Sequence, residues 1–329
     1  MGLALNIFLV MVPLVGILVN KWKAGGSIPE SFHHINLEGK TVLITGSNTG
    51  IGYETALFFA KRGARVIFGA RSFERAEEPL SKIIEETGNK KVEFIAPMDL
   101  SDLQSVRDFV TNLENKQIKI DILVNNAGVM QPPHGLTKDG FEVQFGTNHL
   151  GHFLLTVLLL NKNILKKSAR VVNVSSLASE KASHFLFGSL DYKSKNENIP
   201  VTDLYRISKY SNYLFTRELQ SKYGQYGLTA YSLHPGVILT ELGRHMNLPS
   251  YFEYLKPFAT VFLLKTPYEG AQTSLFAALC DSKDVEPGSY LADCKVKGRP
   301  SWEEEQIVLE EQDRLWYMSE EAVDETSIL

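Results

Sequence analysis

From about residue 40, short runs of β-branched and other apolar residues alternate with longer amphipathic stretches. The runs predict strands at 41–45, 65–69, 91–96, 121–125, 169–174 and 228–233. The stretches predict helices at 50–62, 73–86 and 103–114, a long helix that includes 149–161, and one that ends near 223. Alternating strands and helices form right-handed crossovers and a parallel sheet covered on both faces. The pattern therefore predicts an α/β fold with one doubly wound parallel-sheet domain over residues 37–293.

A separate apolar segment precedes this domain. Residues 3–19 are interrupted only by Asn6 and Pro13 and are followed by Lys21 and Lys23. As a helix the segment would span ~26 Å, close to the ~27 Å hydrocarbon thickness of the endoplasmic reticulum bilayer. It has neither the basic start nor the small-residue cleavage site of a signal peptide. We therefore expect a retained anchor rather than a cleaved leader or a shallow hairpin, with the remainder of the chain in the cytosol.

The hydrophobic pattern also sets the domain organisation. It predicts a membrane anchor at 1–23, a linker at 24–36, the α/β domain at 37–293 and an extension at 294–329. Within the extension, residues 303–321 are charged and predict one helix that carries Leu309, Leu315 and Trp316. The expected location is the endoplasmic reticulum membrane, with the lipid-droplet surface as an alternative.

Composition narrows the function classes. A net charge of −4 spread over 329 residues gives no electrostatic case for nucleic acid binding. The two cysteines, Cys280 and Cys294, stand in neither a CxxC nor a Cys/His metal spacing. A disulfide scaffold and a zinc site are therefore not expected.

A glycine-rich turn follows the first predicted strand. Its spacing, Gly46-x-x-x-Gly50-x-Gly52, differs from the common G-x-G-x-x-G fingerprint. The physical demands are the same: a tight turn, close backbone approach to phosphate, and close packing of helix on strand. The turn predicts the pyrophosphate site of a dinucleotide at a helix N-terminus, as in a Rossmann domain. The alternative is an ordinary glycine-rich connection.

The end of the second predicted strand bears on the choice of cofactor. NAD-preferring folds place an acidic residue there for the ribose hydroxyl, whereas an arginine suits the 2′-phosphate of NADP. The strand ends at Gly69 and is followed by Arg71, with no acidic residue before Glu74. Because guanidinium binds phosphate bidentately, we expect NADP(H). The alternative for Arg71 is a solvated surface side chain.

A tyrosine and a lysine suggest proton transfer beside that cofactor. Tyr205 and Lys209 are four residues apart, so they share one face of a helix. An adjacent ammonium can lower the pKa of a phenol from its ordinary value of ~10. We therefore expect the pKa of Tyr205 to be lowered toward neutrality.

Together these motifs resemble the classical short-chain dehydrogenases/reductases over residues 37–294. The matching motifs are Thr-Gly-x-x-x-Gly-x-Gly at 45–52, Asn-Asn-Ala-Gly at 125–128, the motif of Asn148, Val-Ser-Ser at 174–176, Tyr-x-x-x-Lys at 205–209 and Pro-Gly at 235–236. Within the family, residues 139–152 and 233–236 resemble the retinol dehydrogenases and their membrane-anchored relatives. The apolar segment at 3–19 agrees with that branch.

The resemblance implies a role for each catalytic residue. Tyr205 would be the general acid in reduction and the base in oxidation, and Lys209 would lower its pKa and hold the nicotinamide ribose. Ser176, rather than Ser175, would bind the substrate oxygen. Asn148 would hold a water that links Lys209 to solvent.

The resemblance also implies the cofactor contacts. The expected NADP(H)-binding residues are Gly46, Ser47, Asn48, Gly50, Ile51, Gly52, Arg71, Asp99, Leu100, Asn126, Ala127, Gly128, Tyr205, Lys209, Pro235, Gly236 and Thr240. Three candidates have simpler alternatives: Asp99 could cap a helix that begins near Ser101, Ser176 could be a turn residue, and Asn148 could tie a helix bend. His134, His149, His152 and His234 are interpreted as structural, because no ligand spacing links them.

Two regions suggest the substrate class. The first region is residues 177–204, which include 184–187, and it would follow the fifth strand. The second is residues 246–264, and it would follow the sixth. Both would lie at the carboxyl ends of the strands, where ligands bind. The second region contains five aromatic residues: Tyr251, Phe252, Tyr254, Phe258 and Phe262. Such aromatic content suits an apolar substrate that enters from a bilayer, although a self-packed lid or an oligomer contact is the alternative.

These expectations combine into one functional hypothesis. The chain would be an NADP(H)-dependent oxidoreductase that interconverts an apolar alcohol and its aldehyde or ketone, with retinol and retinaldehyde as the first candidates. The alternatives are a steroid or general carbonyl reductase of the same family, or a protein that binds NADP(H) without turnover. Because the family commonly dimerises, a homodimer is among the expected partners, beside the apolar substrate and the bilayer.

Overall fold

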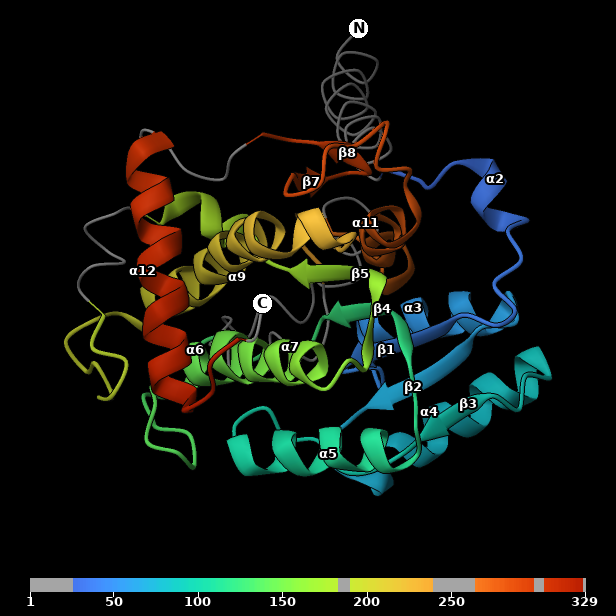
Figure 1. The fold of residues 1–329 in the computed structure, drawn as a ribbon, viewed down its shortest axis with the longest axis horizontal. Helices are drawn as coiled ribbons and strands as arrows, with labels where there is room; N and C mark the ends of the chain where they lie inside the picture. Colours follow the sequence, from blue (N-terminus) through green and yellow to red (C-terminus); the bar gives the residue numbers. More distant parts are fainter. Residues whose placement is uncertain (1–25, 183–189, 239–263, 299–304, 328–329) are drawn as a thin grey trace, which may run out of the picture.

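The fold is a three-layer α/β structure around one sheet (Figure 1). The computed structural model describes residues 26–182, 190–238, 264–298 and 305–327. The sheet has eight strands in the order β3-β2-β1-β4-β5-β6-β7-β8. All neighbouring strands are parallel except β7 and β8, which are antiparallel. The chain crosses over between β3 and β4, where the strand order reverses, and this reversal creates a ligand-binding crevice in such folds.

The elements follow the alternation expected from the sequence. The strands are β1 (Thr41–Thr45), β2 (Arg65–Gly69), β3 (Val92–Phe94), β4 (Ile120–Asn125), β5 (Leu165–Val174), β6 (Thr229–His234), β7 (Tyr290–Ala292) and β8 (Lys295–Val296). The longer helices are α3 (Gly50–Lys61), α4 (Phe73–Thr87), α5 (Leu103–Asn115), α7 (Gly151–Asn161), α9 (Val201–Tyr223), α11 (Pro267–Leu279) and α12 (Glu305–Val323). The shorter helices are α2 (Glu30–His33), α6 (Val143–Phe145), the π-helical η1 (Gly146–Leu150), and the 3-10 turns η2 (Leu177–Lys181) and η3 (Gly224–Tyr226).

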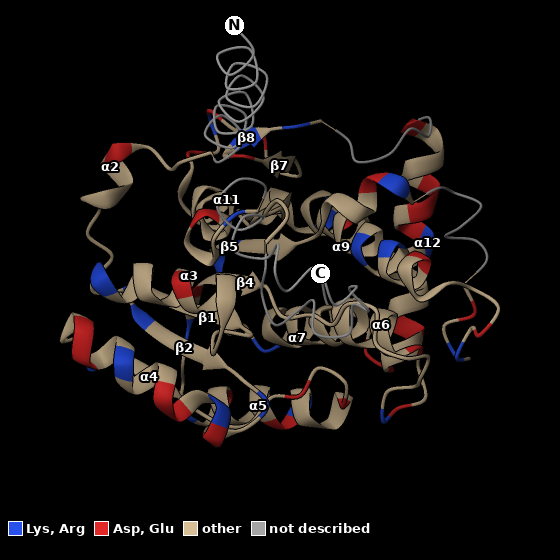
Figure 2. Ribbon diagram, turned by 180° about the vertical axis from the view of Figure 1, so that it is seen from behind, with Lys and Arg blue, Asp and Glu red and all other residues tan. Residues whose placement is uncertain are grey.

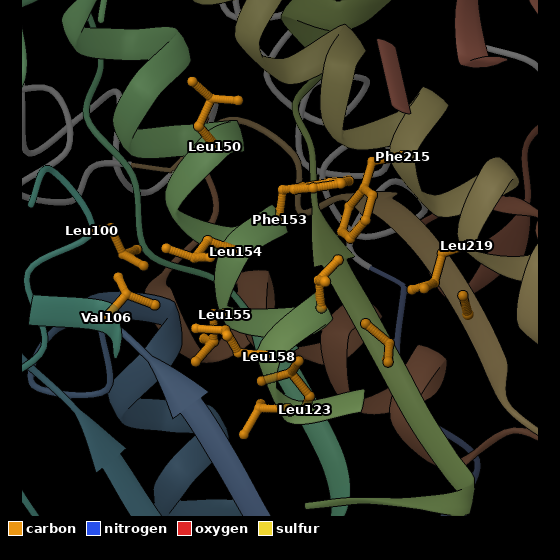
Figure 3. Packing of buried hydrophobic residues seen from close by; sticks show 14 of the residues in the cluster. Leu100, Val106, Leu123, Leu150, Phe153, Leu154, Leu155, Leu158, Phe215 and Leu219 are labelled. Atoms are coloured by element: carbon orange, nitrogen blue, oxygen red, sulfur yellow. The ribbon is translucent and has the colours of Figure 1, made fainter. Parts of the chain in front are cut away.

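The sheet has an apolar core on each face. Successive strand side chains point to opposite faces, so Leu43 of β1 packs with α5, α7 and α9, whereas Val42 and Ile44 pack with α3, α4 and α11. Figure 3 shows the first core, where Phe153 of α7 lies next to Phe215 of α9. Helix α7 carries no charged residue, so other elements can cover it on all sides. Nine of its positions are buried.

Charged residues lie on the outer helices. Figure 2 shows acidic and basic positions along α4, α5 and α12, whereas β1 and α7 carry none. Acidic and basic positions are interspersed on these helices.

The structure confirms all six expected strands and adds β7 and β8. These two strands contain three and two residues, too short for a periodic signal. The β7–β8 hairpin extends past residue 293, the predicted end of the α/β domain. The helix expected at 303–321 is present as α12, which packs on α9 and α7.

The expected membrane anchor at 1–23 lies outside the described residues. Within residues 26–182, 190–238, 264–298 and 305–327, no helix combines the length and apolar character needed to cross a bilayer. The described chain begins at Gly26, whose Cα lies so close to the backbone of Asp293 that a Cβ would come within 2.5 Å of it. Residue 26 therefore lies against the β7–β8 turn.

Candidate active site

The predicted site residues gather at the carboxyl ends of the central strands. The glycine turn follows β1, Asn126 to Gly128 follow β4, Ser176 follows β5, and Pro235 and Gly236 follow β6. Because β1, β4, β5 and β6 are adjacent and parallel, these segments share one edge of the sheet. The fold thus unites residues that lie up to 190 positions apart in the chain.

The glycine turn adopts a conformation that side chains would obstruct. Gly46 and Gly50 have φ values of +66° and +57°, in the left-handed region that favours glycine. A Cβ on Gly52 would come 2.2 Å from the Gly46 carbonyl oxygen and 2.6 Å from Asn126 Nδ2. The turn and the start of α3 therefore approach each other more closely than they could if position 52 carried a side chain.

The same turn has the polar character of an anion site. The Ser47 hydroxyl is fully buried and has no hydrogen-bond partner among the described residues. Thr49, the N-cap of the twelve-residue helix α3, makes no side-chain capping bond, and the first turn of α3 carries no acidic residue. Free N–H groups and the positive end of the helix dipole favour a phosphate there. A dinucleotide pyrophosphate therefore fits this turn.

Hydrogen bonds hold the β1 and β4 ends in register. The Thr45 hydroxyl accepts from the backbone N–H groups of Asn126 and Ala127, both at 2.9 Å. Asn126 Nδ2 donates to the Thr45 carbonyl at 2.8 Å. His152 Nε2 lies 2.8 Å from Thr45 Oγ1, and its Nδ1 lies 3.0 Å from the Asn148 carbonyl. This network connects the glycine turn to the helix that carries Asn148.

Tyr205 and Ser176 meet inside the site. Tyr205 is 5% exposed, and the Ser176 side chain lies close enough to its phenol to lower the pKa of that phenol, against the effect of burial. Ser175 is directed differently, because its hydroxyl donates to the Lys209 carbonyl at 2.6 Å. The choice of Ser176 over Ser175 therefore agrees with the geometry: one serine contacts the phenol and the other anchors β5 to α9.

Lys209 lies beside the β4 turn and the asparagine. Its ammonium donates to the Val174 carbonyl at 3.0 Å and lies 6.0 Å from the centre of the Tyr205 ring. A Cβ on Gly128 would come 3.1 Å from Asn148 Oδ1 and 3.4 Å from Lys209 Nζ. Lys209 and Asn148 therefore flank the same glycine, and only a residue without a side chain leaves this space open.

The expected lowering of the phenol pKa is wrong for the protein alone. Burial raises the pKa of Tyr205 to about 12, and the hydrogen bond from Ser176 opposes this only in part. Burial also lowers the pKa of Lys209 to about 8. Desolvation disfavours both charged forms, and at this separation the ammonium does not reverse its effect on the phenol.

Asn148 ties an irregular helix. Its Oδ1 accepts from the Val129 N–H at 2.8 Å, and its Nδ2 donates to the Val129 carbonyl at 2.9 Å and to Ser208 Oγ at 3.0 Å. The residue sits in the π-helical turn η1, between α6 and α7, and is fully buried. The structural alternative raised for Asn148 is thus present, and π-helical turns are frequent at functional sites.

The other predicted cofactor residues lie around this edge, except one. Arg71 is exposed after β2, and Asn48, Leu100, Ala127, Pro235 and Gly236 lie in the connections that follow the strands, whereas Ile51 lies in the first turn of α3. Asp99 Oδ1 accepts from the N–H and hydroxyl of Ser101, while Asp102 is the N-cap of α5. Thr240 and residues 246–263 lie outside the described residues, as do 184–187.

The four histidines make structural contacts. His134 and His152 bond to backbone carbonyls, and His149 lies 2.7 Å from Ser319 Oγ. Burial lowers the pKa of His152 and of His234 to about 4, so both are neutral near pH 7. In the part of the chain that the structure describes, His, Cys, Asp and Glu side chains form no cluster suited to a metal ion.

Some residues near the site were missed by sequence reasoning. Tyr290 of β7 and Ser179 of η2 both contact the Ser176 carbonyl. Glu180 of η2 pairs with Lys297, which follows β8. Only the pairing of β7 with β6 places Tyr290 there, and a three-residue strand gives no pattern from which this pairing could be read.

Known proteins share this sequence and fold. The family described as short chain dehydrogenase matches residues 40–187. The chain is 39% identical to human retinol dehydrogenase 13, covering 91% of this chain and 88% of that protein. It is 43% identical to human retinol dehydrogenase 11 over 80% of each chain.

A solved structure of an uncharacterized protein from Mycobacterium Paratuberculosis superposes with a TM-score of 0.69 at 33% identity, covering 89% of this chain and 97% of that one. The glycine turn, the Tyr205–Ser176 contact and these likenesses agree with one another. The chain belongs to the short-chain dehydrogenase/reductase family, in the branch of the retinol dehydrogenases.

Proposed function

We propose that the protein is an NADP(H)-dependent oxidoreductase that interconverts an apolar alcohol and its aldehyde or ketone, with retinol and retinaldehyde as the preferred pair. The observation that carries the proposal is the buried contact between Tyr205 and Ser176 at the edge where the glycine turn also lies. The family membership independently supports an enzyme that acts on CH–OH groups.

The chain's own residues supply a proton and hold the reacting oxygen. Because burial raises the pKa of Tyr205 to about 12, the phenol is neutral near pH 7 and can donate its proton to a carbonyl oxygen. The Ser176 hydroxyl, which lies beside that phenol, would bind the same oxygen. A nicotinamide cofactor supplies or accepts the hydride when it is bound. Lys209, cationic below a pKa of about 8, would stabilise negative charge at this position.

The substrate class is supported by the relatives rather than by the described residues. The similar curated proteins are named retinol dehydrogenases, which points to apolar alcohols for this chain as well. The direct experiment measures NADPH consumption with retinaldehyde and with a panel of apolar aldehydes and steroids. Turnover of retinaldehyde supports the proposal. Cofactor binding without oxidation of NADPH by any of these compounds would favour a binding protein instead.

Replacing Arg71 tests the preference for NADP(H). A guanidinium–phosphate contact contributes about 1.5–3 kcal/mol, so Arg71→Ala is expected to raise the KM for NADPH about 10- to 100-fold. The KM for NADH should change by less than about twofold, because NADH lacks the 2′-phosphate. The matched control is Lys82→Ala, which removes one exposed positive charge from the following helix α4. Unchanged NADPH affinity in Arg71→Ala would refute the cofactor assignment.

Deleting residues 1–23 tests the proposed anchor at the endoplasmic reticulum membrane. The truncated chain is expected to move from the membrane fraction to the soluble fraction, because it loses the apolar run at 3–19. Fractionation measures the change, and retained turnover of a water-soluble aldehyde shows that the catalytic domain remains folded. If the truncated chain stayed with membranes, the anchoring role would belong to another segment, such as the aromatic region at 246–264.

A further inference from the structure

A buried tyrosine lies behind the catalytic serine. Tyr290 of β7 is 2% exposed, and its hydroxyl donates to the Ser176 carbonyl at 3.2 Å. It also lies 3.4 Å from the Ser179 hydroxyl, which donates to the same carbonyl at 2.6 Å. The Ser179 N–H adds a third contact to that oxygen at 2.9 Å. Two side chains and one backbone group therefore converge on a single carbonyl.

This carbonyl controls the turn that presents the serine hydroxyl. Ser176 is the N-cap of η2, and its Oγ accepts from the Ala178 N–H at 3.1 Å. Its backbone is extended, with φ −158° and ψ 153°, so the peptide plane after Ser176 determines where η2 starts. The side chain of the same residue contacts Tyr205. Movement of the carbonyl would consequently move the hydroxyl relative to the phenol.

The ring of Tyr290 is itself held in place. It packs edge-on against Tyr213 of α9, with ring centres 5.9 Å apart, and lies tilted against the His234 ring of β6, with ring centres 5.8 Å apart. Glu180 of η2 is tethered to the other side of the hairpin, because Lys297 Nζ lies 2.5 Å from its carboxylate. The β7–β8 hairpin thus contacts η2 through both a buried hydroxyl and an ion pair.

We propose that Tyr290 is a positioning residue for Ser176: its hydroxyl, together with that of Ser179, fixes the Ser176 carbonyl and so keeps the serine side chain against Tyr205. The inference rests on the proposed oxidoreductase function. It assigns to the short strand β7 a task in the reaction, in which the hydroxyl of Tyr290 acts through the Ser176 carbonyl and the Ser179 hydroxyl.

The test is a double-mutant cycle between Tyr290→Phe and Ser176→Ala. The phenylalanine keeps the ring packing and removes only the hydroxyl. Losing a hydrogen bond of ordinary strength corresponds to about a 3- to 10-fold change, so Tyr290→Phe is expected to lower kcat by about that factor and to leave the Kd for NADPH unchanged. In the Ser176→Ala background the same substitution should have almost no effect, because the group that it positions is gone.

Tyr231→Phe is the matched control. Tyr231 lies on the neighbouring strand β6, is fully buried, and its hydroxyl donates to the Val285 carbonyl at 2.7 Å. Its ring belongs to the core on the opposite face of the sheet. This variant should lose stability like Tyr290→Phe yet retain the parental kcat. Equal losses of kcat in the two variants, or a Tyr290→Phe effect that persists without the Ser176 hydroxyl, would overturn the proposal.

Two additions keep the test decisive. If Tyr290→Phe does not fold, Ser179→Ala removes the second hydroxyl on the same carbonyl and should lower kcat in the same direction, whereas an unchanged kcat would count against the proposal. A crystal structure of either variant should show the Ser176 side chain displaced from Tyr205. This readout needs no substrate, so it separates a failure of the inference from a failure of the proposed function.

Discussion

Replacing Tyr205 by phenylalanine is expected to lower kcat for carbonyl reduction about 10²- to 10⁴-fold, the usual contribution of a positioned general acid. The substitution removes the phenol hydroxyl beside the Ser176 side chain and leaves a ring of nearly the same volume at a residue that is 5% exposed. The Kd for NADPH should remain within about twofold, because the glycine turn and Lys209 stay in place. Single-turnover kinetics and equilibrium titration with NADPH measure the two quantities.

Tyr223→Phe provides the control for this experiment. Tyr223 is a buried tyrosine at the other end of the same helix, α9, and has no place in the proposed site. It should keep the parental kcat. Near-parental turnover in Tyr205→Phe would refute the assignment of the acid, even if cofactor binding were intact.

The pKa values explain which protonation state the chain provides. With a pKa of about 12, Tyr205 remains a proton donor at every pH at which such an enzyme is assayed. The group that titrates within the assay range is Lys209, whose pKa is about 8. In the proposed mechanism the protein alone would therefore donate a proton in reduction, and oxidation would require an additional interaction that stabilises the phenolate.

The sequence predicted the central strands closely and the edge of the sheet poorly, for a physical reason. Strands β1 and β2 have the expected limits because each is a compact β-branched run next to a glycine turn or a charged boundary. Strand β5 begins at Leu165 rather than at 169, because the polar residues at 166–168 interrupt the apolar pattern. Its pairing with β4 is irregular there, since Ile120 pairs with Leu165 and Ile122 with Arg170. Strand β7 depends on pairing with β6, and strand β8 on pairing with β7, which local sequence does not encode.

In the candidate site, residue spacing could be read from the sequence, whereas the burial of each side chain could not. Four-residue spacing correctly placed Tyr205 and Lys209 on one side of α9, and the motif order placed Ser176 next to the phenol. The direction of the pKa shift could not be inferred from spacing, because it depends on how completely both groups are buried. Tyr290 was missed because a residue that acts through a carbonyl leaves no motif.

Trp316→Ala is expected to destabilise the fold by about 3–5 kcal/mol, the usual cost of removing a buried tryptophan. Trp316 of α12 is 2% exposed, and its ring lies edge-on to Phe153 of α7 at 5.1 Å and stacks on Phe215 of α9 at 5.8 Å. Its Nε1–H also donates to Glu320 at 2.9 Å. Truncation would leave a large cavity where three helices meet, and the surrounding rings can fill it only in part.

The expected change in Tm is a decrease of roughly 5–15 °C, measured by calorimetry with denaturant unfolding as a second method. Tyr317→Ala is the matched control, because its side chain is the next residue of α12 and is 62% exposed. It should change stability by less than about 0.5 kcal/mol. A similarly small effect of Trp316→Ala would mean that α12 is not part of the cooperative core. A large effect would instead show that the helix beyond the parallel sheet stabilises α7 and α9, the second of which carries Tyr205 and Lys209.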